Sequence, residues 1–392
     1  MAARGPIAST SAIALAISLA ALLPSPAAGA PVGATVKADD ANATIRGGVL
    51  GSDMELAVVP DAENRLVLVR DTAGLNAGRG CEPVTAIAVR CSLSQPEITI
   101  NVDLGGGDDT LAAFGDGSRT TLDAQLGEGT DSGTLEQDAA FCGGYPCRLS
   151  GGGDDDTLVG GNTTGYFLAG GPGDDLLTAN GSSVFEGGPG DDTENGSPGT
   201  DSFGTPDPGD DVVYGNGGTD HVHEQAGADL LHGGSGADWI YTDLGKGRES
   251  ADLIDGDAGV DGYVRYCGSC EITLDTIAND GRRGADEGDQ IDVEMLDIEN
   301  TVSNENRKPL GTGSDRLVGN ERPNTIFASR GGDVVVGRDG ADELYSNSGN
   351  DIIRAVDGQR DRVIDCGGGI DRAFIDRLDK AAESCERVVV RP

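Results

Sequence analysis

The chain has 392 residues, of which 64 are Gly and 16 are Pro, and aromatic residues make up only 4%. These few large side chains cannot fill the thick globular core that a chain of this length would need. Bound metal, disulfides or repetition must therefore stabilise the fold. Acidic residues number 67 against 28 Lys and Arg, which gives a net charge of −39. This charge argues against nucleic acid and anionic membranes as partners and favours cations.

Residues 1–30 have the order of a secretory signal peptide. Arg4 precedes an apolar run at residues 12–23, and small residues follow at 27–30. The run is too short to span a bilayer, and the Pro- and Gly-rich stretch after it disfavours the alternative of a buried N-terminal helix. No later stretch is apolar enough for a transmembrane helix. We therefore expect a secreted, extracellular protein with no membrane span.

Residues 31–102 alternate apolar and polar positions. Segments 55–59 and 65–69 flank a turn at 60–64, which predicts a β-hairpin, and further strands are expected around Thr85 to Arg90 and Glu97 to Val102. The last of these leads directly into the region that follows. We interpret 31–102 as an N-terminal β cap that covers the open end of a repeat structure.

Residues 103–264 and 309–365 contain a nine-residue repeat. From Gly187 six successive windows carry Gly at the fourth place, Asp at the sixth and usually an apolar residue at the eighth, with one residue slipped. A second run opens at Leu310, and outlying copies surround Asp109, Asp156 and Asp175. A register kept over so many copies indicates a stacked repeat architecture.

The chemistry of each place in the repeat suits a metal-binding solenoid. Gly permits the positive φ and close backbone approach of a tight turn. The apolar residues Val213, Val222, Leu231 and Ile240 would fill a thin interior. Stacking would bring Asp residues of alternate repeats within about 5 Å, where like charges repel unless a cation intervenes. Carboxylate and carbonyl oxygens suit calcium, whereas zinc and copper prefer His or Cys.

These windows resemble the RTX, or haemolysin-type, calcium-binding nonapeptide GGxGxDxUx. The resemblance implies an all-β parallel β-roll in which GGxGxD forms a turn, xUx forms a strand, and two nonapeptides make one coil. It also implies several Ca²⁺ ions as cofactors. The alternatives are a solvated Gly-rich linker, which needs no register, and a metal-free β-solenoid, which would leave the negative charge unscreened.

The side chains that the repeat places as calcium ligands are Asp109, Asp156, Asp175, Asp192, Asp201, Asp211, Asp220, Asp229, Asp238, Asp252, Asp261, Asp315, Asp333, Asp342 and Asp351. The resemblance adds backbone carbonyl ligands at Gly171, Gly173, Gly188, Gly190, Gly234 and Gly236.

Two further segments depart from the repeat. Residues 265–308 break the register and contain two longer predicted strands, from Glu271 to Asp280 and from Asp292 to Val302, joined by an acidic loop. Similar interruptions occur in RTX-type exported bacterial proteins, so we expect the solenoid to continue through this segment. Residues 366–392 are expected to form a C-terminal cap closed by a disulfide.

The eight cysteines fall into four close pairs: Cys81 with Cys91, Cys142 with Cys147, Cys267 with Cys270, and Cys366 with Cys385. An even count with local spacing in an exported protein favours structural disulfides, although eight cysteines allow 105 pairings. A zinc site at the C-x-x-C motif is disfavoured because no second pair or His lies close in sequence. A redox role of this motif is also disfavoured, because no thioredoxin-like βαβ pattern surrounds it.

No catalytic motif stands out. A GxSxG elbow is absent, and His223-Glu224 lacks the second His of HExxH because Gly227 stands there. We therefore expect no catalytic residues and a non-enzymatic calcium-binding protein that folds on binding Ca²⁺, with a structural or interaction role. The alternatives are an extracellular solenoid hydrolase or lyase acting on polysaccharide, and an adhesion or matrix protein with a cell surface or polysaccharide as its partner.

Overall fold

The computed structural model describes residues 34–39, 41–47, 53–60, 65–71, 75–85, 88–95, 97–114, 120–135, 147–204, 208–224, 227–242, 252–259, 261–265, 270–282, 289–292, 295–298, 314–328 and 330–392. These residues form strands, turns and bends but no helix. None of the described segments is thus a helix of the length and apolarity needed to cross a membrane. The predicted signal peptide lies outside the described residues.

The chain divides into two compact units, Met1–Gly152 and Gly153–Pro392. The strands that begin in the first unit are β1 (Ala34–Ala38), β2 (Asn42–Arg46), β3 (Asp53–Pro60), β4 (Arg65–Asp71), β5 (Leu75–Ala77), β6 (Cys81–Thr85), β7 (Ala88–Leu93), β8 (Ile98–Gly106), β9 (Thr110–Phe114), β10 (Thr120–Glu128), β11 (Ser132–Leu135) and β12 (Cys147–Gly153).

Antiparallel strands occupy the early part of the first unit. β3 pairs antiparallel with β4, with Leu56 opposite Val69, which confirms the predicted hairpin. β7 pairs antiparallel with both β4 and β6. The single strand expected around Thr85 to Arg90 is wrong, because β6 ends at Thr85 and β7 begins at Ala88.

Parallel pairing begins within the same unit. β2 pairs with β8 and β8 with β10, while β3 pairs with β9 and β9 with β11, all in parallel. Ile100 and Leu122 are register partners 22 residues apart, and both are buried. The antiparallel strands therefore continue into the parallel coils through shared hydrogen bonds.

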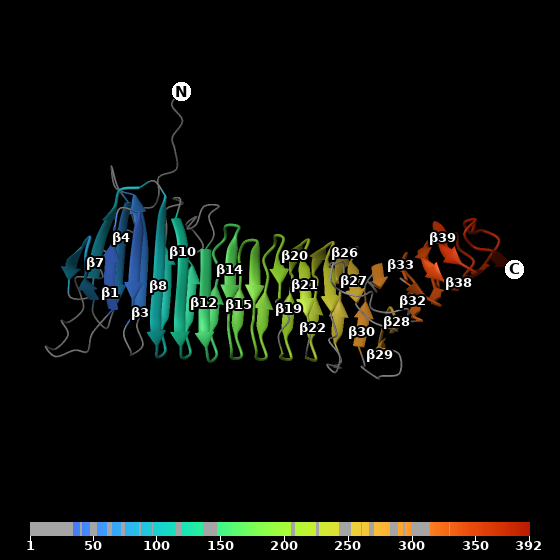
Figure 1. The fold of residues 1–392 in the computed structure, drawn as a ribbon, viewed down its shortest axis with the longest axis horizontal. Coiled ribbons are helices and arrows are strands. Elements are labelled where there is room, and N and C mark those ends of the chain that lie inside the picture. Colours follow the sequence, from blue (N-terminus) through green and yellow to red (C-terminus); the bar gives the residue numbers. More distant parts are fainter. Residues whose placement is uncertain are drawn as a thin grey trace, which may run out of the picture. The chain divides into compact units, whose positions relative to one another are not determined.

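Two parallel rows of short strands form most of the second unit (Figure 1). The first row runs in the order β14 (Tyr166–Ala169), β16 (Ser183–Glu186), β18 (Ser202–Phe203), β21 (His221–Glu224), β24 (Trp239–Thr242), β27 (Gly262–Arg265), β31 (Met295–Ile298), β33 (Thr325–Phe327), β36 (Glu343–Tyr345) and β39 (Val363–Asp365). The strands of the second row are β13 (Thr157–Val159), β15 (Leu176–Thr178), β17 (Thr193–Asn195), β19 (Val212–Tyr214), β22 (Leu230–His232), β25 (Leu253–Asp255), β28 (Cys270–Thr273), β32 (Arg316–Val318), β35 (Val334–Val336), β38 (Ile352–Ala355), β41 (Arg372–Ile375) and β42 (Arg387–Val390).

Two-residue strands pair in the turns of the second unit. They form two small sheets, β20 (Gly217–Gly218) with β23 (Ser235–Gly236) and β26 (Ala258–Gly259), and β34 (Arg330–Gly331) with β37 (Ser348–Gly349) and β40 (Gly368–Gly369).

The central residue of each short strand points into the interior of the second unit. Val213 pairs in register with Leu231 on the second row, and Val222 pairs with Ile240 on the first. All four side chains are fully buried, as predicted. Each pair is 18 residues apart, so one coil consists of two nonapeptides. The described fold is thus the expected parallel β-solenoid.

The solenoid pairing continues through the predicted interruption. β31 pairs in parallel with β27 and with β33. Each of the two long strands expected here is divided in two. The first consists of β28 and β29 (Asp275–Arg282), which are separated by Leu274, and the second of β30 (Asp289–Asp292) and β31. β29 pairs antiparallel with both β28 and β30, so a hairpin is added to the parallel coils.

Two disulfides are described in full, Cys81–Cys91 and Cys366–Cys385, as predicted. Cys147 is also disulfide-bonded. Its predicted partner Cys142 lies outside the described residues, as does Cys267 of the remaining pair.

Candidate functional site

The sixth-place aspartates of the repeats lie in the turns between strands and form chains of hydrogen bonds, which we call the inner ladder. In each step, Oδ1 of one Asp accepts a hydrogen bond from the backbone N–H of the sixth-place residue one coil earlier. Asp211 Oδ1, for example, accepts from Asp192, and Asp229 Oδ1 accepts from Asp211, at 2.8 and 2.9 Å. The predicted neighbourhood of Asp192, Asp211 and Asp229 is therefore confirmed.

The inner ladder runs along both sets of turns. On one side of the second unit it joins Asp156, Asp175, Asp192, Asp211, Asp229 and Asp252. On the other side it joins Asp201, Asp220, Asp238 and Asp261. Asp315, Asp333 and Asp351 form a third run, and Asn324 leads into Asp342 in a fourth. In the first unit, Asp109 donates its N–H to Asp131.

All fifteen aspartates selected from the sequence are buried, with at most 5% of each residue exposed. Among the described residues, the second carboxylate oxygen, Oδ2, is buried without a hydrogen-bond partner on Asp175, Asp220, Asp238, Asp333, Asp342, Asp361 and Asp371. A buried polar atom left in this state is costly, and most native structures contain few. The arrangement thus presents oxygen acceptors that nothing in the described part of the chain satisfies.

Burial dominates the electrostatics of these carboxylates. The pKa of Asp220 is raised to about 7, chiefly by loss of solvent and also by the neighbouring Asp238 and Asp201 charges, against the hydrogen bond from the Asp201 N–H, which lowers it. Burial likewise raises the pKa of Asp175, Asp333 and Asp342 to about 7. The charged form is therefore disfavoured in the folded chain unless a positive charge enters the turns.

Glycine makes room for these carboxylates and for the backbone around them. A methyl group at Gly233, the first residue of its repeat, would lie 2.9 Å from Oδ2 of Asp238. The six glycines selected as carbonyl ligands all have positive φ, between 97° and 155°. The carbonyl oxygens of Gly171 and Gly173 face Gly188 and Gly190 in the next coil, so closely that a side chain there would overlap them. Backbone oxygens of successive coils therefore converge in the turns.

An outer ladder, which the sequence analysis did not select, runs beside the inner one. It consists of the fifth-place residues Asp155, Asp174, Asp191 and Asp210. Here the direction is reversed, because Oδ1 of each Asp accepts from the backbone N–H of the following coil, as Asp174 does from Asp191 at 2.9 Å. These residues are exposed. The signal for them was the Asp-Asp dipeptide in the repeats.

The inner ladder also includes residues that the sequence analysis passed over. They are Asp131, Asp361, Asp371 and Asp379. Asp371 holds the sixth place of a window that begins at Cys366, with Gly369 at the fourth place and Ala373 at the eighth. This window fits the repeat and would have identified Asp371. At Asp361 the fourth-place Gly is replaced by Gln359, so the pattern is weaker.

The histidine of the incomplete HExxH motif, His223, stacks on a tyrosine ring. His221 and His223 lie on β21 beside Tyr241, with the His223 and Tyr241 rings stacked at 4.4 Å, and both point away from the interior residue Val222. Burial and the nearby His221 lower the pKa of His223.

Comparison with protein families matches segments of the chain to the RTX calcium-binding nonapeptide repeat. The matched residues are 148–163, 167–194, 207–223, 225–248, 311–344 and 318–353. No curated protein matches the chain. The matched segments contain most of the inner-ladder aspartates of the second unit, among them Asp175, Asp220 and Asp333, and the six glycines selected as carbonyl ligands. On this repeated pattern and match, the second unit carries RTX calcium-binding nonapeptide repeats.

Proposed function

We propose that this protein is an exported calcium-binding structural protein whose solenoid folds when Ca²⁺ enters the turns of the inner ladder. The observation that carries the proposal is the set of buried Oδ2 atoms without partners, on residues such as Asp220 and Asp238. Calcium is a hard cation that takes six to eight oxygen ligands, a donor set that these turns supply. RTX repeats in a β-solenoid fit such a role.

The proposed side-chain ligands are the fifteen aspartates predicted from the sequence, together with Asp131, Asp361, Asp371 and Asp379, which occupy the same ladder. The carbonyl groups of Gly171, Gly173, Gly188, Gly190, Gly234 and Gly236 are proposed as backbone ligands. Their support is the all-oxygen chemistry of the turns and the close approach of successive coils. A bound divalent ion supplies the positive charge that the buried carboxylates lack. The free energy of binding then contributes to folding.

Export is supported by the order of residues 1–30 and by the disulfides, because disulfides persist in oxidising compartments. Calcium is abundant outside cells, so the proposed folding would follow export. A structural rather than catalytic role is supported by the repeats, which occupy most of the second unit.

The direct test is far-ultraviolet circular dichroism of the chain with disulfides intact, titrated with calcium and separately with magnesium. A cooperative gain of β signal with calcium alone is expected. The double variant Asp220→Asn with Asp238→Asn should raise the calcium midpoint by about tenfold or more, because two charged ligands are lost.

The matched control is Asp191→Asn with Asp210→Asn, which removes the same charge from the exposed outer ladder. Its calcium midpoint should stay close to that of the unmodified chain. A β spectrum indifferent to calcium and chelator would contradict the proposal. Equal effects of the two double variants would show that net charge alone, and not the inner ladder, governs the response.

A further inference from the structure

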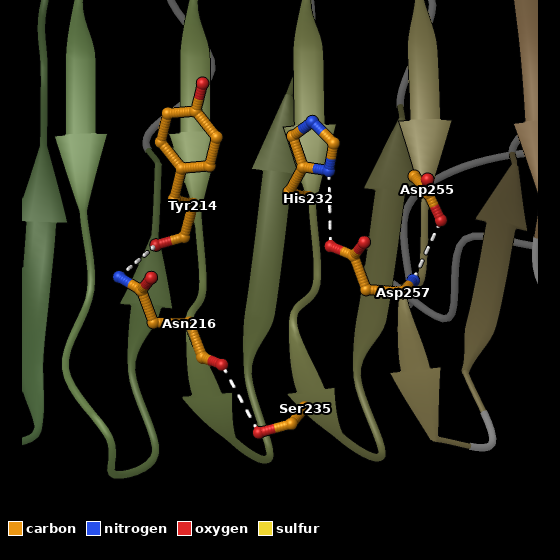
Figure 2. Close-up of polar contacts among 6 residues, drawn as sticks. All are labelled: Tyr214, Asn216, His232, Ser235, Asp255 and Asp257. Atoms are coloured by element: carbon orange, nitrogen blue, oxygen red, sulfur yellow. Dashed lines mark hydrogen bonds and ion pairs between the residues drawn. The ribbon is translucent and has the colours of Figure 1, made fainter.

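A cluster of mixed nitrogen and oxygen donors lies outside the inner ladder, on His232, Asp255 and Asp257 of the second unit (Figure 2). One ligand atom from each of these residues lies within 4.8 Å of the other two. His232 Nδ1 and Asp257 Oδ2 are 3.2 Å apart. The imidazole distinguishes this cluster from the oxygen-only turns of the solenoid.

Strand pairing and one turn bring the three residues together. His232 ends β22 and Asp255 ends β25, and the two are register partners. Asp257 lies in the turn after β25 with a φ of 63°, a conformation that Asp tolerates better than most residues. Oδ1 of Asp255 accepts the backbone N–H of Asp257 at 2.9 Å, which fixes the turn and directs the Asp257 carboxylate to His232.

Among the described residues, such a cluster of donors occurs at this pair of coils alone. Two coils before Asp255 and Asp257, Tyr214 and Asn216 occupy the same places of the repeat, and one coil before them His232 and Gly234 do. The Asn216 amide donates instead to the carbonyl of Gly196 at 2.9 Å. The Tyr214 ring stacks on His232 with centroids 5.3 Å apart and so limits the rotation of the imidazole. The repeat pattern alone therefore does not account for the three donors.

We propose that His232, Asp255 and Asp257 form a zinc-class metal site separate from the calcium-binding turns. One imidazole nitrogen with two carboxylates is a donor set of zinc and related transition metals, whereas calcium and magnesium select oxygen. Ligands about 2.1 Å from a tetrahedral zinc ion are about 3.4 Å from one another. The 3.2 Å separation of Nδ1 and Oδ2 is close to that requirement.

The site has room for further ligands from solvent. The side chains of His232 and Asp257 are 26% and 39% exposed. Three protein ligands with an open position completed by water is a common zinc arrangement. The ion would join β22 to β25 at the point where the ladder step from Asp229 to Asp252 spans 23 residues, against 17 to 19 in the preceding steps. It would therefore join two coils that are farther apart in sequence than the coils before them.

The test is zinc binding by isothermal titration to the full chain in excess calcium, supported by the visible absorption of bound Co²⁺. We expect one zinc ion that calcium does not displace. His232→Gln and Asp257→Asn should each weaken zinc binding by about tenfold or more. Asp257→Asn keeps a residue that tolerates positive φ, so a loss of binding in this variant is not a loss of the turn. His223→Gln is the matched control, because His223 also occupies the ninth place of its repeat and stacks on a Tyr.

Unchanged zinc affinity in both site variants would overturn the proposal, and so would zinc that excess calcium displaces. Loss of zinc binding in the site variants but not in His223→Gln would support it. The inference does not depend on calcium-driven folding. If calcium left the circular dichroism unchanged, the comparison between His232→Gln and His223→Gln would still decide the zinc site.

Discussion

At the residue scale, each sixth-place aspartate uses its two oxygens differently. Oδ1 accepts a backbone N–H of the previous coil, as Asp238 does from Asp220 at 2.8 Å. Oδ2 of the same residue is buried beside the first Gly of its repeat, where a side chain would crowd it. The glycine and the aspartate of one repeat are therefore selected together, since the carboxylate can occupy the turn only where no Cβ stands.

We predict that Gly190→Ala destabilises the calcium-loaded solenoid more than Gly165→Ala. Both glycines have positive φ, 146° and 97°, so each alanine variant bears the left-handed strain of about 1–2 kcal/mol. At Gly190 a methyl group would also overlap the carbonyl of Gly173, whereas at Gly165 nothing lies within 4 Å. Urea unfolding in calcium measures the difference.

Gly368→Ala serves as the neutral control for this pair, because Gly368 has no positive φ and open space around its α-carbon. It should change the free energy of unfolding little. Equal losses for Gly190→Ala and Gly165→Ala would show that the carbonyl of Gly173 shifts without penalty and would contradict the close packing of coils.

At the scale of the element, a strand of three residues contributes one buried side chain and cannot stand alone. The strands on either side stabilise it, so a repeat with an unsuitable residue can still form its strand. Glu194 occupies the interior position of β17 between Leu177 and Val213, and it is only 3% exposed. On the other row, the Phe185 and Phe203 rings stack at 4.7 Å. The neighbouring coils thus keep β17 in register despite an unsuitable residue.

The Cys366–Cys385 disulfide secures the last strands of the solenoid. We predict that Cys366→Ala with Cys385→Ala lowers the free energy of unfolding by about 3 kcal/mol, since the bridge closes a loop across 19 residues. Loss of hydrogen-exchange protection should be concentrated in β41 and β42. In β39 and the adjoining turn, hydrogen bonds between Ser384 and both Asp365 and Cys366 would also weaken.

The control for the disulfide prediction is Cys81→Ala with Cys91→Ala, which opens a bridge across 10 residues in the first unit. This variant should leave protection in β41 and β42 unchanged. If the Cys366 and Cys385 variant instead lost protection evenly along the second unit, the bridge would not act locally.

The sequence predicts the coil but not its irregular parts. The period of nine places Val213 and Leu231 in the interior, because both hold the eighth place, which is apolar in most repeats and lies at the centre of the short strand. The outer ladder was not predicted, since exposed Asp residues carry no periodic apolar signal of their own. Asp361 was missed for a different reason: the ladder step to it spans 19 residues, while the strand partners Leu344 and Ile364 are 20 apart. A local insertion of one residue conceals such a site from pattern reading.

At the scale of the whole molecule, the net charge of −39 combines two populations of carboxylates. The exposed ones are solvated and screened by salt. The buried ones on the inner ladder are not, and they repel one another along each set of turns. Without a bound cation, ionisation of these carboxylates therefore destabilises the folded state. The free energy of folding thus depends on both proton binding and metal binding.

This linkage predicts that, in chelator, the β signal and thermal midpoint are greater at pH 5 than at pH 8. Burial raises the pKa of Asp175, Asp220, Asp333, Asp342 and Asp361 to about 7, whereas an unfolded Asp titrates near about 3.9. Between these values the folded chain binds more protons than the unfolded chain, so stability falls as the pH rises through this window. Calcium requires the ionised carboxylates and should reverse the trend, with protons released on binding. Calorimetry at several pH values measures both effects.

The Asp220→Asn with Asp238→Asn variant should lose part of the pH dependence in chelator, and the Asp191→Asn with Asp210→Asn variant should keep it. A midpoint in chelator that rises from pH 5 to pH 8 would contradict the buried charge of the inner ladder.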